Sequence, residues 1–366
     1  NYNTPVDVDA FEREAKRILE EVEQECGWMY ETYHVLEGQL QTDAFGQPIK
    51  GRINYTVWSD VFVCPDCSGE IIFWEAAVDQ EQGKVKDTFT CPTCGAEHTK
   101  RSVERAWEVK FDPAINETVR QAKQVPVLIN YSVGNKRFDK RPDEHDLALI
   151  NKIEEMEIPY WFPTDRMPEG EESRRNDIIG LTHVHHFYTK RSLWILSAIN
   201  HKIKKPQVQL LFNSQLINIS KLNRYRPGVS FPYNPLSGTL YIGSQVSESN
   251  VFTAYYNKLR RLVSAFKNTS YNTALSVKSS SENADLTCDY IFTDPPFGNN
   301  IMYSELNFLW ESWLKVKTNN VSEAIVNKTQ RKGLTEYQQL MEACFKEYYR
   351  ILKPGRWMTV EFSNSQ

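Results

Sequence analysis

A chain of 366 residues is longer than one ordinary domain, so we expect two or three packed units with sizeable cores. Hydrophobic residues make up 40% and charged residues 25% of the chain, ordinary globular values, and no apolar run approaches the ~18 residues of a membrane span. The net charge of −4 does not mark a nucleic-acid binder, so contact with phosphates would depend on local clusters of Lys and Arg. The seven cysteines do not form a disulfide framework, which favours a reducing cytoplasm.

Periodic patterns of apolar residues predict helices and strands along most of the chain. In the first half of the chain we expect a helix over 7–26 capped by Asp7 or Asp9, a strand over 52–63, a strand over 125–129 with Pro126 near its start, and a helix that opens after Pro142. Further along we expect a loop over 159–180, a helix over 187–203, a loop over 227–245 with a short strand at 239–242, and a helix over 250–266. In the last hundred residues, strands at 276–277, 289–293 and 357–362 alternate with helices at 304–313 and 334–352. Such alternation predicts a parallel sheet flanked by helices.

Four of the cysteines form two C-x-x-C pairs. Cys64 and Cys67 make the first pair and Cys91 and Cys94 the second, and each pair includes a turn-forming Pro or Gly. Four thiolates at this spacing form a closed tetrahedral zinc site, which stabilises a fold but leaves no open position for catalysis. We therefore expect a structural zinc ribbon. A redox-active dithiol is the alternative, and His98 could replace one ligand.

A short motif directly after a predicted strand carries chemistry: Asp294-Pro295-Pro296-Phe297. Parallel sheets present ligand-binding loops at the carboxyl ends of their strands. The Asp294 carboxylate can accept hydrogen bonds from an aromatic amine, Pro295 fixes the loop and exposes its carbonyl, and Phe297 can stack on a base. An amine of this kind is the exocyclic amino group of a nucleobase. It is hidden in duplex DNA, so the base would have to rotate out of the duplex into the site. Taken alone, the four residues could also be a proline-stiffened turn.

The residues that flank this motif carry a family resemblance. Ile291 to Gly298 resembles the fourth motif of the exocyclic-amino DNA methyltransferases, and Tyr349 to Trp357 resembles the turn before the fifth strand of their fold, with Arg356 in place of a glycine. Residues 301–310 resemble more narrowly a bacterial group of adenine-specific methylases with large inserts. The resemblance covers residues 270–366 well and the middle of the chain loosely.

This resemblance implies a Rossmann-like α/β fold with a parallel-rich sheet and helices on both faces. It also implies S-adenosylmethionine as the methyl donor and, because the motif begins with Asp, adenine as the favoured base. The family binds its cofactor with a glycine-rich loop, and residues 1–366 contain no such loop. We therefore expect that loop in the remainder of the same polypeptide, with Thr293 and Asp294 lining the site, and weak or no cofactor binding by this chain alone.

The predicted organisation is a methyltransferase core interrupted by two inserts. The core comprises residues 1–55 and the catalytic part 241–366, the zinc ribbon spans 56–110, and a DNA-recognition region spans 111–240. The predicted function is methyl transfer to the exocyclic amino nitrogen of a flipped DNA base without a covalent enzyme intermediate. An RNA base amino-methyltransferase with the same site is one alternative, and a noncatalytic nucleic-acid module on a methyltransferase scaffold is another.

Several other groups of residues admit both a functional and a structural interpretation. Basic clusters at 136–141, 202–205 and 221–226 would form a DNA groove if they came together, although each alone is an ordinary solvated surface. The aromatic run 160–162 could stack on bases but is more often core packing.

Two groups of side chains near residue 180 also remain open. The close histidines His183, His185 and His186 have no carboxylate at matched spacing, so hydrogen-bonded histidines are preferred to a metal site. The remaining candidates, which could contact phosphate or pair with local acids, are Arg174, Arg175 and Arg191.

Overall fold

The computed structural model describes residues 5–79, 84–226, 235–268, 287–299 and 301–362. Its centre is a mostly antiparallel sheet built around one long strand, β4 (Lys50–Val63). β13 (Gln124–Val133) pairs with one edge of β4, while β1 (Glu31–Tyr33) and β15 (Gln245–Ser249) pair with the other, all antiparallel. The sheet is completed by β14 (Lys136–Lys140), which pairs with β13, and by β5 (Glu70–Ile72) and β10 (Glu104–Arg105), which pair with the end of β4.

The predicted Rossmann-like fold is therefore wrong. The strands β1 and β15, which come from the two ranges expected to form a parallel core, both pair antiparallel with β4 and share their sheet with β13. Alternation of apolar residues predicts a strand, but it carries no information about partner or direction. In addition, β15 is buried at every position although its sequence is Gln-Val-Ser-Glu-Ser, so hydropathy could not predict it as a core strand.

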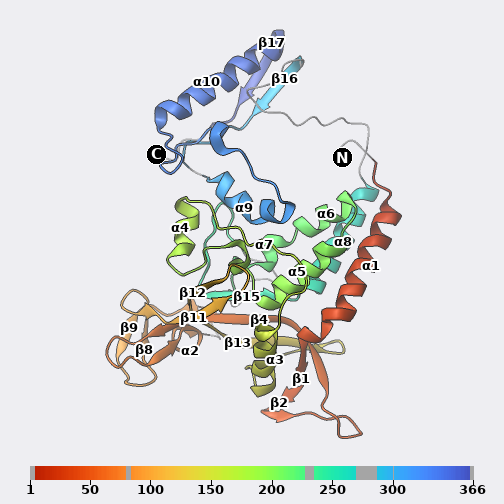
Figure 1. Cartoon of the computed structure of the whole chain (residues 1–366), viewed down its shortest axis with the longest axis vertical. Helices are drawn as coiled ribbons and strands as arrows, with labels where there is room; N and C mark the ends of the chain where they lie inside the picture. The colour runs from red at the N-terminus through yellow and green to blue at the C-terminus, as the bar shows by residue number, and fades with distance from the viewer. Residues whose placement is uncertain (1–4, 80–83, 227–234, 269–286, 300, 363–366) are drawn as a thin grey trace.

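Helices cover the sheet and enclose the main hydrophobic core. α1 (Val8–Cys26), α5 (Lys190–Lys202) and α8 (Val251–Lys267) contact one another and lie together on one side of β4 in Figure 1. The core-facing side chains of α1 recur at helical spacing, and Asp7 caps the helix by accepting a hydrogen bond from the Ala10 N–H at 2.9 Å. The helix predicted at 7–26 and its cap are confirmed.

The C-terminal segment forms a separate β-α-β unit. β16 (Cys288–Thr293) and β17 (Leu352–Val360) pair in parallel. α10 (Leu334–Ile351) directly precedes β17 in the chain. β16 and β17 are the one parallel pair among the described residues. This unit lies at one end of the molecule, opposite the end that carries β1 and β2 (Figure 1).

α9 (Tyr303–Leu314) connects this unit to the rest of the chain. It contacts both α7 (Leu216–Ile219) and α4 (Glu171–Asp177). The buried Glu305 carboxylate accepts hydrogen bonds from the first backbone N–H groups of α4, those of Glu172 at 2.9 Å and Ser173 at 3.0 Å. A side chain of α9 therefore caps α4, because the first N–H groups of a helix have no partner within it.

The remaining elements are short or lie at the periphery. They are the helices α2 (Phe73–Ala77), α3 (Glu144–Glu155) and α6 (Pro206–Asn213), the 3-10 turns η1 (Gly27–Tyr30), η2 (Val184–Phe187) and η3 (Asn320–Ser322), and the strands β2 (Val35–Leu36), β3 (Gln39–Leu40), β6 (Val78–Asp79), β7 (Lys84–Val85), β8 (Thr88–Thr90), β9 (Glu97–Thr99), β11 (Trp107–Asp112) and β12 (Glu117–Ala122). Among the described helices, none combines the length and the apolar character that a membrane crossing requires.

Several local predictions differ from these elements. The range 159–180, predicted as a loop, contains α4, and the strand predicted at 239–242 lies instead at 245–249 as β15. The strand predicted at 276–277 and the first part of the loop predicted at 227–245 lie outside the described residues.

Candidate functional site

Each C-x-x-C pair lies in the turn of its own antiparallel hairpin. β4 and β5 flank the first pair, and β8 and β9 flank the second. The same backbone hydrogen bond closes both turns. The Ser68 N–H donates to the Cys64 carbonyl at 2.9 Å, and the Gly95 N–H donates to the Cys91 carbonyl at 2.9 Å. Both Ser68 and Gly95 have positive φ, 60° and 76°, so the two turns share one backbone conformation.

The four cysteine side chains converge on one point. All four sulfur atoms lie within 4.8 Å of one another, with Cys64 and Cys94 Sγ 3.7 Å apart and Cys67 and Cys91 Sγ 3.6 Å apart. A disulfide requires about 2.05 Å. Four thiolates 2.3 Å from one tetrahedral metal ion would be about 3.8 Å apart. The observed spacing therefore fits a shared metal ion better than a disulfide.

The surroundings favour a thiolate at Cys91, where the backbone N–H groups of Cys94 and Thr93 lower the pKa to about 6. Backbone N–H groups also act to lower the pKa values of Cys67 and Cys94, but desolvation and hydrogen bonds with Cys64 and Cys91 outweigh them and raise both. The buried His98 places Nε2 3.2 Å from Cys64 Sγ and 3.4 Å from an Asp66 carboxylate oxygen. Because the four sulfurs already surround one point, His98 hydrogen-bonds a sulfur from outside the set rather than replacing one.

The predicted Asp-Pro-Pro-Phe loop begins where the β16–β17 pair ends. The Thr293 carbonyl accepts a hydrogen bond from the Glu361 N–H at 2.9 Å, so strand pairing continues to the residue before Asp294. Asp294 is exposed, Pro295 is buried and Phe297 is half-buried. The structure therefore places the Asp294 carboxylate in solvent at the carboxyl end of a parallel strand, the position at which such sheets bind ligands.

Contacts on the far side of the loop hold it in place. The Tyr337 hydroxyl of α10 donates to the Pro296 carbonyl at 2.6 Å, and the Phe297 ring packs edge-on against Phe362 with centroids 5.2 Å apart. The Pro296 carbonyl is therefore used within the protein. Asp294 is the acceptor that this geometry presents outward.

A second cluster of titratable groups joins η2 to β11. The structure supplies the carboxylate that the sequence did not reveal: Asp112 Oδ2 lies 2.8 Å from His185 Nε2 and 2.9 Å from His186 Nε2, and all three residues are buried. The three ligand-type atoms are close enough to share a metal ion. Asp112 lies about seventy positions earlier in the chain, so no local motif could have predicted it.

The hydrogen bonds of His186 decide between a metal site and a structural one. Its Nδ1 accepts the backbone N–H groups of Thr182 at 3.2 Å and His183 at 3.3 Å. The proton of the neutral ring must then lie on Nε2, which donates to Asp112 and has no lone pair for a metal. We therefore interpret Asp112, His185 and His186 as a hydrogen-bonded connection between the β11–β12 hairpin and η2.

This cluster predicts a dependence of stability on pH. Burial lowers the pKa of His186 from 6.5 to about 4, although Asp112 acts in the opposite direction. As the pH falls, His186 therefore binds a proton in the unfolded chain before it does so in the folded protein. The contribution of neutral His186 to folding stability is complete above pH 6.5 and is lost as the pH falls toward 4. We expect the free energy of unfolding to fall by roughly 2–3 kcal/mol over this range.

The control for this prediction is the His186→Gln variant, whose amide can still donate to Asp112 but does not titrate. Urea denaturation of both proteins at several pH values measures the difference, which cancels the titration of other groups that face His186, chiefly His183, His185 and Lys221. Parallel pH profiles for the two proteins would contradict the assignment.

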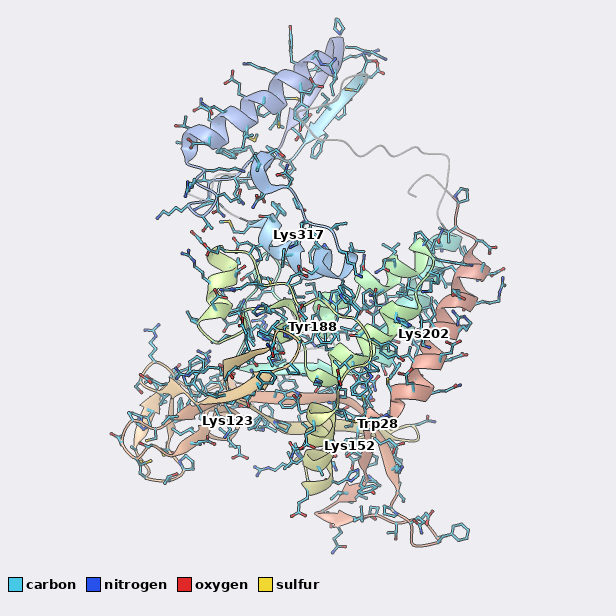
Figure 2. All side chains as sticks on the ribbon, viewed as in Figure 1. Trp28, Lys123, Lys152, Tyr188, Lys202 and Lys317 are labelled. Carbon is cyan, nitrogen blue, oxygen red and sulfur yellow. The ribbon has the colours of Figure 1, made fainter. Side chains whose placement is uncertain are left out.

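Members of each basic cluster are engaged within the protein. Lys140 lies 2.6 Å from Asp143 and 2.8 Å from Asp146. Lys202, labelled next to α1 in Figure 2, pairs with Glu21 of that helix at 3.3 Å. Burial lowers the pKa of Lys221 to about 8. The ion pairs of Lys140 and Lys202 reduce the positive charge that the first two clusters can offer to a nucleic acid.

The arginines singled out in the sequence pair with acids. Arg191 is buried and lies 2.7 Å from Glu248. Arg175 lies 3.0 Å from Glu172, and Arg174 lies 3.9 Å from Glu169. In the aromatic run, Tyr160 and Phe162 pack against the core, whereas Trp161 is 44% exposed with the Lys315 ammonium 4.0 Å from its ring centre.

Comparison with models of protein families, with curated proteins and with solved structures gave no match to this chain.

Proposed function

We propose that this protein takes part in S-adenosylmethionine-dependent methyl transfer to the exocyclic amino group of a nucleic-acid base, with adenine in DNA favoured. The observation that carries this proposal is the position of Asp294, an exposed carboxylate at the carboxyl end of β16 in a parallel β-α-β unit. Its sequence context resembles the catalytic motif of exocyclic-amino methyltransferases, and the antiparallel sheet elsewhere in the chain does not alter this local geometry.

The residues of the loop have distinct tasks in this proposal. Asp294 accepts a hydrogen bond from the amine of the extruded base, which holds the nitrogen in a fixed orientation. Phe297 stacks on the base and compensates part of the stacking lost from the duplex, while Phe362 and Tyr337 hold the loop from behind. S-adenosylmethionine would supply the methyl group when bound.

We also propose that the four-cysteine cluster binds one structural zinc ion. The sulfur spacing matches a tetrahedral thiolate site, and four protein ligands leave no position for water or substrate. The zinc would therefore stabilise the two hairpins and take no part in methyl transfer.

The test of the catalytic proposal is transfer of labelled methyl groups by the full-length protein. Replacing Asp294 by alanine is expected to lower transfer to duplex DNA by roughly 100-fold or more, because it removes a positioned hydrogen-bond acceptor from the reacting nitrogen. The matched control is Asp289→Ala, which removes an exposed carboxylate of the same strand whose partners are Lys353 and Arg356. This variant is expected to retain activity.

The same assay separates the alternatives. Transfer to structured RNA but not to duplex DNA would replace the DNA proposal by the RNA one. Undiminished transfer by the Asp294→Ala protein would reject the catalytic role of this residue. Nucleic-acid binding without transfer to either substrate would indicate a noncatalytic module.

A further inference from the structure

A tight turn lies directly beside the Asp294 loop. Asn327 and Lys332 exchange both backbone hydrogen bonds, at 2.9 and 3.0 Å, and thereby close the turn. The Asn327 side chain is buried: Oδ1 accepts the Gln330 N–H at 3.0 Å, and Nδ2 contacts Met302 Sδ at 3.2 Å. The turn is therefore held by side chains as well as by its backbone.

Further contacts fix the turn relative to the proposed base-binding loop. The Val326 N–H donates to the Gly298 carbonyl at 3.1 Å, one residue after Phe297. Gln330 Nε2 donates to Glu323 at 2.7 Å, and the same Glu323 carboxylate accepts from the Ser304 hydroxyl at 2.9 Å at the start of α9. The turn thus contacts both the Asp294 loop and the first turn of α9.

The turn carries three cations, of which two face solvent. The Lys332 ammonium donates to the carbonyls of Asn320 and Glu323, both at 2.6 Å, so it serves the fold. Lys328 and Arg331 are exposed, and within the described ranges neither forms an ion pair. Two exposed cations therefore lie on a turn that is hydrogen-bonded to Gly298, the residue after Phe297.

The backbone at Arg331 has a φ of 54°, in the left-handed region that glycine adopts at lower cost. Ser68 and Lys315 share this turn conformation. Glycine would therefore fit the turn at position 331, so the cation can be removed there without straining the backbone.

We propose that Lys328 and Arg331 bind backbone phosphates of the nucleic acid next to the extruded base. This inference rests on the proposed function and assigns it a substrate-positioning surface, distinct from the basic clusters noted in the sequence. Duplex DNA presents one negative charge per ~1.7 Å of its axis, so phosphates that flank an extruded base lie within reach of cations on this turn. Phosphate contacts position the nucleic acid without reading its sequence.

The experiment measures binding of a fluorescein-labelled 20-base-pair duplex to the full-length protein over a range of salt concentrations. The Lys328→Ala/Arg331→Ala double variant is expected to bind roughly tenfold more weakly at 0.15 M salt, and the slope of log K against log salt should become shallower by about 2. The control is Arg13→Ala/Lys16→Ala on α1, which also removes one Arg and one Lys from exposed positions, although Lys16 pairs with Glu12 at 2.8 Å. The control is expected to leave the affinity within about twofold and the slope unchanged.

A second variant distinguishes phosphate binding from a structural role. Arg331→Gly removes the cation but suits the left-handed backbone, so its folding is expected to be at least as stable as that of the wild type. It should still lose about threefold in affinity, and Arg331→Lys should restore most of it. Unchanged affinity and slope in Arg331→Gly and in the double variant would overturn the proposal.

Methyl transfer by the same proteins separates this inference from the proposed function. If the wild type methylates DNA, the double variant should show a raised KM with kcat retained at saturating DNA. A reduced kcat with an unchanged salt slope would overturn the phosphate assignment while the function stands. A wild type that transfers no methyl group, but whose salt slope depends on Lys328 and Arg331, would reject the function and support the phosphate contacts.

Discussion

Replacing Cys91 by serine is expected to abolish zinc binding and to unfold the β8–β9 hairpin, which carries the second cysteine pair. This hairpin is short, and the small core beneath it, which includes Phe62, Phe73 and Phe89, is separate from the main core of the protein. A core of this size rarely folds without a staple. Structural zinc sites in small peptides contribute roughly 10 kcal/mol or more of folding free energy, so no side-chain contact in the region can compensate for the loss.

The measurement is metal content by mass spectrometry together with hydrogen exchange of residues 62–99. The wild type is expected to contain about one zinc ion per chain and to protect β8 and β9 from exchange, whereas the Cys91→Ser protein should do neither. Cys344→Ser is the matched control, because Cys344 lies on α10 outside the cluster. Full protection of β8 and β9 in metal-free Cys91→Ser protein would contradict the zinc proposal.

Replacing Glu248 by alanine is expected to lower the free energy of unfolding by about 3–5 kcal/mol. Glu248 and Arg191 are both buried, and each carboxylate oxygen accepts a hydrogen bond from the guanidinium, at 2.9 and 2.7 Å. Trp58 Nε1 at 2.8 Å and the Thr189 hydroxyl at 2.6 Å complete the shell of the carboxylate. Without Glu248, the guanidinium would remain as an uncompensated charge between β4, β15 and α5.

Chemical denaturation measures this loss. The control is Glu31→Ala, which breaks an exposed ion pair with Lys50 at 2.6 Å and is expected to change the free energy of unfolding by less than about 1 kcal/mol. Equal and small effects of the two substitutions would show that the buried network does not stabilise the sheet.

Local structure was predictable from the sequence where one short pattern determined it. Helical spacing and a capping residue were sufficient for α1 and for α8, where Asn250 accepts the Thr253 N–H at 3.1 Å as a cap. The spacing of the two C-x-x-C pairs was sufficient to predict that the four cysteine side chains lie together. The loop after β16 lies where the parallel-strand pattern of the C-terminal part predicted it.

What could not be predicted depended on contacts between distant parts of the chain. β4 pairs with strands on both edges, and nothing in the residues of β4 specifies whether its partners are parallel or antiparallel. The polar strand β15 is buried only because Arg191 and Trp58, both far away in the sequence, satisfy Glu248. Asp112 joins the histidines of η2 for the same reason, through a hairpin folded against them.

The candidate site itself combines both cases. The motif that contains Asp294 and Phe297 was recognisable by its residues alone. The basic turn at Lys328 and Arg331 was not, because its importance depends on the contact between Val326 and Gly298 that sets it beside the loop. The sequence signal that could have found it is the run Asn327 to Gly333, which combines three cations with turn-forming residues.

The most direct measurement of the central claim is single-molecule sequencing of DNA from cells that express the full-length protein. We expect a methylated amino group, on adenine, at a recurring sequence context in cells with the wild-type protein, and its absence in cells with the Asp294→Ala protein. The same methylation in both cell populations, or in neither, would contradict the claim that Asp294 positions a nucleobase for methyl transfer to DNA.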